Sequence, residues 1–238
     1  FAERVGAPLR AWRLEGAERL KDGESLNGGG VRLVALHTPG HSADHVCFSI
    51  PETGALFTGD TVVGRGTSFV DPPDGDLAKY LHSLEALLAL HPATIYPGHG
   101  PVVPDAEAKL REYLDHRAER ESQILDGLVD GATTVASLVA RIYADYPPEV
   151  HPLAARSVTA HLLKLEAEGR AQKKGRGASQ TWQPLAPRAC ARCGKPVKGR
   201  AMYCNACMLT MLQEGAERAD AADGDQDEAA SRTGERTT

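Results

Sequence analysis

His-Thr-Pro-Gly-His occupies residues 37–41 and directly follows an apolar run, residues 31–36, that predicts a β-strand. The same arrangement returns twice. Thr-Gly-Asp at residues 58–60 and Tyr-Pro-Gly-His at residues 96–99 each end a short apolar strand and include a glycine. Because glycine permits tight turns, each strand end can direct a polar side chain into one shared cleft.

Each motif contributes one candidate metal ligand: His41, Asp60 and His99. Imidazole nitrogen and carboxylate oxygen suit zinc and its neighbours in the transition series. Asp60 has two oxygens and is suited to bridge two metals, with His41 on one and His99 on the other. Two such metals lie about 3.5–4 Å apart and share a hydroxide that is nucleophilic at neutral pH. The motifs therefore indicate a hydrolytic site with these three residues as its catalytic group.

The sequence around the motifs resembles a known family. Residues 31–104 are similar to the C-terminal half of the metallo-β-lactamase fold, a four-layer αββα hydrolase, and residues 37–45, 57–60 and 96–100 match its third, fourth and fifth motifs in order. The resemblance implies two catalytic zinc ions bridged by Asp60. Family members hydrolyse β-lactams, thioesters, phosphodiesters and other esters, so the fold leaves the substrate open.

The resemblance extends beyond the motifs, to about residues 1–185. Tyr-Leu-Asp-His-Arg at residues 113–117 looks like the β-lactamase-like protein 2 subfamily. Members of that subfamily carry a winged helix after the catalytic domain, and the best-known member is an endoribonuclease specific for single strands. The resemblance therefore implies two substrate classes, single-stranded RNA and small esters or thioesters.

One part of the family pattern is missing. The principal signature, His-x-His-x-Asp-His, supplies two ligands to each metal, and residues 1–36 contain no histidine. A catalytic zinc normally needs three protein ligands. Since the first residue is Phe1 and not Met, we expect a longer parent protein that contains the signature and is a dinuclear zinc hydrolase. We expect the chain as printed to be an inactive fragment with open sheet edges.

The pattern changes after Pro104. Apolar periodicity predicts helices over residues 107–128, 134–145 and 153–168, followed by a basic, Gly-rich hairpin that ends near Trp182. Three helices and a hairpin suggest a winged helix. An earlier helix is predicted from the N-cap Asp76 to about Leu90, and the end of another within residues 1–12. The predicted domains are a partial metallo-β-lactamase fold over 1–106, a winged helix over 107–185, a zinc ribbon over 188–213 and a disordered acidic tail over 214–238.

The ribbon is predicted from four cysteines, Cys190, Cys193, Cys204 and Cys207. They form two Cys-x2-Cys pairs separated by ten residues. Each pair can present two thiolates to one tetrahedral zinc, and four thiolates leave no open position, so we expect one structural zinc. Clustered cysteines also favour metal binding in a reducing compartment over disulfides, which predicts a cytoplasmic protein. The remaining cysteine, Cys47, is predicted to be a small buried residue.

Residues 169–200 contain nine basic side chains and no acidic one. Such a stretch is a candidate for contact with nucleic acid phosphates, although a hairpin that only packs on the catalytic domain remains an alternative. The helix at 153–168 carries balanced charge, which favours nonspecific RNA contact over reading of a DNA groove. The net charge of the whole chain is -5, so there is no bulk attraction to nucleic acid or membrane, and no apolar run could span a bilayer.

Most other polar candidates are expected to have structural roles. His37 is expected in a turn, and His45 either orients the site from a second shell or starts a strand. Arg65 and Ser68 either meet substrate or lie in a solvated loop. The remaining histidines are expected on helix or loop surfaces: His82, His91, His116, His151 and His161.

The sequence as a whole predicts an α+β protein: a partial αββα sandwich, then a winged helix and a zinc ribbon. We expect the parent to be a hydrolase in which metal-bound hydroxide attacks an ester, a thioester or an RNA phosphodiester. The alternative is a nucleic-acid-binding or scaffold protein built on a degenerate hydrolase domain.

Overall fold

The computed structural model describes Gly6, residues 8–185 and the short segments 188–189, 192–193, 196–197 and 206–211. The chain divides into two compact units, one formed by residues 1–166 with 171–184 and the other by residues 167–170 with 185–238. Across the described part of the chain, no helix combines the length and apolar character that crossing a bilayer requires.

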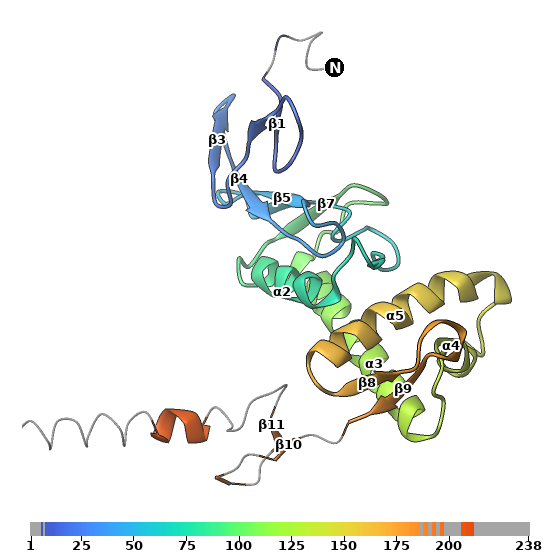
Figure 1. The fold of residues 1–238 in the computed structure, drawn as a ribbon. Coiled ribbons are helices and arrows are strands. Elements are labelled where there is room, and N and C mark those ends of the chain that lie inside the picture. Colours follow the sequence, from blue (N-terminus) through green and yellow to red (C-terminus); the bar gives the residue numbers. More distant parts are fainter. Residues whose placement is uncertain are drawn as a thin grey trace, which may run out of the picture. The chain divides into compact units, whose positions relative to one another are not determined.

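The first unit contains a five-stranded sheet in the order β3-β4-β5-β6-β7 (Figure 1). Its strands are β3 (Ser25–Gly28), β4 (Val31–His37), β5 (Val46–Ile50), β6 (Ala55–Gly59) and β7 (Thr94–Pro97). The first four pair antiparallel, and β7 pairs parallel to β6. As a result β4, β6 and β7 run in one direction and end at the same edge of the sheet.

Two helices cover one face of this sheet. They are α2 (Leu77–Leu88) and α3 (Ala106–Val129). Leu56 and Ile95 point into the core that these helices close, and both are fully buried. Side chains alternate across a strand, so Phe57 and Tyr96 lie on the opposite face, where they stack at 5.1 Å and stay about 40% exposed. The described residues thus form one sheet with its helical layer, half of an αββα sandwich.

Local signals set where both helices begin. The carboxylate of Asp76 accepts a hydrogen bond from the backbone N–H of Lys79 at 3.1 Å and caps α2. Asp105 caps α3 in the same way through Ala108, at 2.9 Å. An N-cap of this type satisfies one of the N–H groups that the first helical turn leaves without a partner. Both predicted helices are confirmed, within a residue or two of their expected ends.

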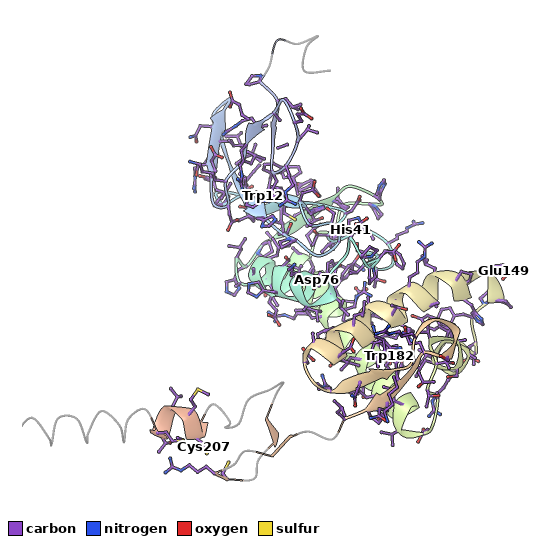
Figure 2. All side chains as sticks on the ribbon, viewed as in Figure 1. Trp12, His41, Asp76, Glu149, Trp182 and Cys207 are labelled. Atoms are coloured by element: carbon purple, nitrogen blue, oxygen red, sulfur yellow. The ribbon has the colours of Figure 1, made fainter. Side chains whose placement is uncertain are left out.

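The winged helix has its own core. It contains α4 (Val135–Ile142), α5 (His151–Ala167), and the hairpin of β8 (Ala171–Lys174) and β9 (Thr181–Pro184), with 3-10 turns at Pro148–Val150 and Gly177–Ser179. Trp182 is 2% exposed and packs among the helices (Figure 2). The later half of α3 also contributes to this core. The helix therefore belongs to two cores at once.

Of residues 1–12, predicted to hold a helix end and a connection, the structure describes Gly6 and residues 8–12, and the predicted helix end lies outside the described residues. From Arg10 the chain forms two short parallel strands, β1 (Arg10–Ala11) and β2 (Glu18–Arg19). The Trp12 ring stacks on His37 at 3.7 Å with an interplanar angle of 9°. This stacking places the segment against the end of β4, a contact that a local helix signal cannot anticipate.

The second unit contains the cysteine-rich stretch. Strands β10 (Arg188–Ala189) and β11 (Pro196–Val197) pair antiparallel, and a short helix spans residues 206–211. Cys193 is exposed and Cys207 is half-buried. Cys190, Cys204 and the predicted acidic tail at 214–238 lie outside the described residues.

Candidate metal centre

The three candidate ligands meet at the edge of the sheet where β4, β6 and β7 end. His41 follows β4, Asp60 follows β6 and His99 follows β7. His41 Nε2 lies 3.9 Å from Asp60 Oδ2, and His99 Nε2 lies 3.5 Å from Asp60 Oδ1. The parallel sense of the three strands explains this convergence of residues that are up to 58 positions apart in the sequence.

Asp60 stands between the two imidazoles, and each of its oxygens faces a different one. Within the described ranges, no group of three metal-binding side chains gathers around a single point. The arrangement is therefore two donor pairs that share one carboxylate. This donor set fits two metal positions that share Asp60. It would supply two protein donors to each position, whereas a catalytic zinc normally needs three.

The orientation of His41 is set by the backbone. Its Nδ1–H donates a hydrogen bond of 2.6 Å to the carbonyl of Phe69. In the neutral ring the proton is therefore on Nδ1, which leaves Nε2, the nitrogen that faces Asp60, as the metal donor. Metal-binding histidines commonly use their second nitrogen in this way, because the hydrogen bond fixes both the tautomer and the ring direction.

His45 lies behind the site and holds Asp60 in place. Its Nε2 accepts a hydrogen bond of 3.1 Å from the backbone N–H of Asp60, so Nδ1 carries the proton and faces the hydroxyls of Thr38 and Thr61 at 3.0 and 3.1 Å. Burial lowers the pKa of His45, with the nearby His41 adding to the effect, and keeps the ring neutral. Of the two sequence-based alternatives for His45, the structure supports orientation from a second shell.

We use the name metal loop for residues 60–70, the first part of the segment between β6 and α2, which begins with Asp60. Within it Ser68 is 6% exposed, and its hydroxyl donates to the carbonyl of Asp60. The expectation that Ser68 meets substrate or solvent is therefore wrong: it bonds back to the loop that carries it. Arg65, in contrast, is exposed.

Two glycines allow the close approaches that form the site. Gly40 has a φ of +138°, and a Cβ there would lie 2.3 Å from Cα of Tyr80 in α2. Gly59 has a φ of +50°, and a Cβ there would lie 2.8 Å from His45 Nε2. Both glycines belong to the motifs. Gly40 lets α2 approach the backbone, and Gly59 lets the His45 ring do so.

Several residues considered from the sequence lie outside this site. His37 is the last residue of β4 and pairs with Val46, so its predicted place in a turn is wrong; its ring stacks on Trp12, and its Nε2 lies 3.1 Å from the carbonyl of Ala43. Burial raises the pKa of Cys47 to about 11, as expected for a small buried thiol. His161 is only 1% exposed, so its predicted surface position is wrong. Its place in α5 follows from how that helix packs on α3.

Two segments of the chain match known families. Residues 2–99 match the Metallo-beta-lactamase superfamily, and residues 134–182 match the Beta-lactamase associated winged helix domain. The first match includes all three candidate ligands.

Individual relatives agree with these matches. A protein named Beta-lactamase-like protein 2 homolog from Drosophila melanogaster is 40% identical over 149 residues, 61% of this chain and 49% of that protein. An Atrochrysone carboxyl ACP thioesterase from Aspergillus chevalieri is 34% identical, over 70% of this chain and 56% of that protein. A solved metallo-beta-lactamase family protein from Thermus thermophilus superposes with a TM-score of 0.61 at 27% identity, over 72% of this chain and 55% of that one. The chain thus spans about half the length of the relatives it matches.

Proposed function

Because residues 2–99 belong to the metallo-beta-lactamase superfamily and residues 134–182 form its associated winged helix, we propose that the full-length protein is a zinc-dependent hydrolase. The observation that carries this proposal is the position of Asp60. Its two carboxylate oxygens face the Nε2 atoms of two different histidines at 3.9 and 3.5 Å. A carboxylate placed in this way is suited to bridge two metal ions.

His41, Asp60 and His99 are the proposed ligands from this chain. They supply each metal position with one imidazole and one shared carboxylate oxygen. We propose that the remaining donors belong to a His-x-His-x-Asp-His signature in the full-length protein. When bound, two zinc ions supply Lewis acidity and lower the pKa of water.

The side chains of this site have separate tasks in the proposed reaction. Asp60 would hold both metals, and the carbonyl of Phe69 holds His41 in one tautomer. His45 fixes the backbone at Asp60 and is kept neutral, so it adds no positive charge beside the metals. The His99 side chain is 80% exposed and its Nε2 faces Asp60, so this nitrogen is accessible to a metal.

For the substrate we propose the carbonyl of an ester or a thioester. The support is the similarity to proteins named as acyl carrier protein thioesterases, one of which aligns with 70% of this chain. A single-stranded RNA phosphodiester is the second candidate. It is favoured by Lys173, Lys174 and Arg176, which are all exposed on the winged-helix hairpin. The residues 169–200 are the proposed contact with RNA.

We also propose a structural zinc bound by Cys190, Cys193, Cys204 and Cys207. The sequence spacing supports it, and so does the antiparallel pairing of β10 with β11 on either side of the first cysteine pair. The binding of zinc would supply most of the folding free energy of such a small domain. Residues 1–106, 107–185 and 188–213 remain our proposed domain limits, with α3 contributing to the first two.

The experiment that tests the hydrolase compares the full-length protein with its Asp60→Asn variant. We expect about two catalytic zinc ions per chain in the wild type. In the variant, activity and zinc affinity should each fall by at least about 100-fold, which is more than the change of a residue that only supports a ligand typically causes. Asp115→Asn, on the exposed surface of α3, is the matched control and should change neither property.

Activity is measured on short acyl thioesters, aryl esters and single-stranded RNA. Cleavage of RNA alone would replace the ester proposal with the RNA proposal. A full-length protein that binds nucleic acid, but neither holds the two zinc ions nor hydrolyses any of the three substrates, would support the degenerate-domain alternative.

A further inference from the structure

We propose that Arg117 of α3, together with Tyr113 and Tyr80, positions the metal loop and so sets the geometry of the candidate metal centre. This inference rests on the proposed function and deepens it. None of the three side chains is a candidate ligand. They are positioning residues that act on Asp60 and His41 through the backbone of residues 60–70.

Two tyrosine hydroxyls hold the first part of the metal loop. The hydroxyl of Tyr80 donates a hydrogen bond of 2.6 Å to the carbonyl of Thr61, the residue after Asp60. The hydroxyl of Tyr113 accepts one of 3.0 Å from the N–H of Val63 and lies 3.3 Å from the carbonyl of the same residue. Both rings are fully buried, so these hydroxyls are fixed in place by core packing.

Arg117 holds the later part of the same loop. Its Nη2 donates to the carbonyl of Ser68. The hydroxyl of Ser68 donates in turn to the carbonyl of Asp60 and lies 3.5 Å from Nδ1 of His41. One guanidinium is therefore linked to two candidate ligands through a single serine.

The cost of burying Arg117 points to a specific role. Arg117 is 5% exposed, and within the described part of the chain it forms no ion pair. Instead its guanidinium lies 5.5 Å from the centre of the Tyr80 ring, and its Nε has no hydrogen-bond partner among the described residues. A permanently charged group is expensive to bury without a carboxylate. The hydrogen bond from Arg117 to the carbonyl of Ser68 offsets part of this cost. It requires a donor with the length and direction of the arginine side chain.

The winged helix reaches the same loop from another side. Arg156 of α5 forms an ion pair of 2.9 Å with Asp71, the residue that follows the loop. Both side chains are partly exposed, so this pair contributes less than the buried contacts. Because α3 and α5 are also the two long helices of the winged-helix core, side chains from the helices of that core contact both the metal loop and the residue that follows it.

The test uses Tyr113→Phe, Tyr80→Phe and Arg117→Lys in the full-length protein, with cobalt as the metal probe. Changing a residue that supports a metal ligand typically lowers metal affinity or activity by about 10–100-fold. We expect a loss in that range for Arg117→Lys and for at least one of the two tyrosine variants. We also expect a shift of the cobalt d–d absorption and a lower kcat with little change in KM. A simple loss of folding stability would not move the cobalt spectrum of the folded protein.

Tyr143→Phe is the matched control. It removes the same hydroxyl from a tyrosine whose ring lies 4.3 Å from the Arg120 guanidinium in the winged helix, and it should leave metal affinity and spectrum unchanged. If Arg117→Lys does not fold, the two tyrosine variants carry the test, because each removes only one oxygen.

The outcomes separate this inference from the proposed function. If the wild-type protein binds cobalt and the variants keep its metal affinity, cobalt spectrum and kcat, that outcome overturns the positioning role alone. A wild-type protein that binds no cobalt beyond the one ion expected at the four cysteines, and hydrolyses nothing, overturns the proposed function and the positioning role with it.

Discussion

His45 and His161 show how burial gives two histidines different roles. Burial lowers the pKa of both rings. At His45 every ring nitrogen faces a hydrogen-bonding group, so the neutral ring is a fixed support for Asp60. At His161 neither ring nitrogen has a hydrogen-bond partner among the described residues, and burial lowers the pKa to about 3. After burial, the positive charges of Arg117, Lys164 and Arg120 and the nearby His116 lower the pKa of His161 further.

We predict that His161→Leu makes the protein more resistant to acid. A histidine whose pKa is lower in the folded state than in the unfolded state binds fewer protons when folded, so its presence destabilises the protein as the pH falls from about 6.5 toward 3. The variant should remove a pH-dependent loss of up to about 1.4 kcal/mol per pH unit in that window. At pH 7 it should be as stable as the wild type or more stable, since it removes two buried polar atoms without partners.

Urea unfolding at several pH values between 4 and 7 measures this effect. His82→Gln, an exposed change on α2, should leave the pH dependence as in the wild type. Parallel stability curves for the wild type and His161→Leu would show that His161 is not kept neutral by burial.

Among the elements, α2 and the turn after β4 approach each other closely at the site. The N–H of Asp76, the cap of α2, donates to the carbonyl of Gly40 at 2.8 Å. The hydroxyl of Ser83, about two turns further along the helix, donates to the carbonyl of Pro39 at 2.8 Å. The motif at residues 37–41 is thus attached to the helix at two points, and His41 is presented from a rigid turn.

We predict that Gly40→Ala destabilises the first unit by about 2–5 kcal/mol. A methyl group there would lie 2.3 Å from a backbone atom of Tyr80, and the φ of +138° is unfavourable for any residue with a Cβ. The thermal midpoint should fall accordingly. Gly131→Ala is the control, because Gly131 also has a positive φ, +93°, but has nothing within 4 Å of its missing Cβ. Equal losses in the two variants would mean that backbone strain alone, and not the contact with α2, accounts for the effect.

At the scale of the whole molecule, two different uses of metal are proposed. The candidate site at the sheet edge offers two histidines and one aspartate, which would leave coordination positions open on each metal, whereas four thiolates would enclose a zinc completely in the second unit. An open site suits catalysis and a closed site suits structure. The two sites should therefore respond differently to a chelator.

We predict that the four C-terminal cysteines of the purified protein react slowly with a thiol reagent and become reactive after prolonged chelation. Release of one zinc per chain should accompany the reaction. Cys47 should remain unreactive until the protein unfolds, because burial raises its pKa to about 11. Four rapidly reactive thiols in the absence of chelator would contradict the structural zinc, whereas a Cys193→Ser variant should lower the zinc content of the protein by one ion.

Local sequence signals alone determined much of this protein. The strand ends, the capping residues Asp76 and Asp105, and the three polar residues beside glycines were all predictable, because each depends on a few neighbouring residues. The sequence also predicted that His41, Asp60 and His99 share one cleft, whereas the common direction of β4, β6 and β7 that brings them together came from the structure. The family was predictable from the same motifs.

Only the tertiary structure decided the support of the site. Arg117 and Ser68 are 49 positions apart in the sequence, and no periodicity or motif relates them. The choice between two roles for His45, the burial of His161 and the stacking of Trp12 on His37 depend in the same way on segments that meet only after folding. Their contacts follow from the three-dimensional packing of helices and loops, which short-range sequence patterns do not encode.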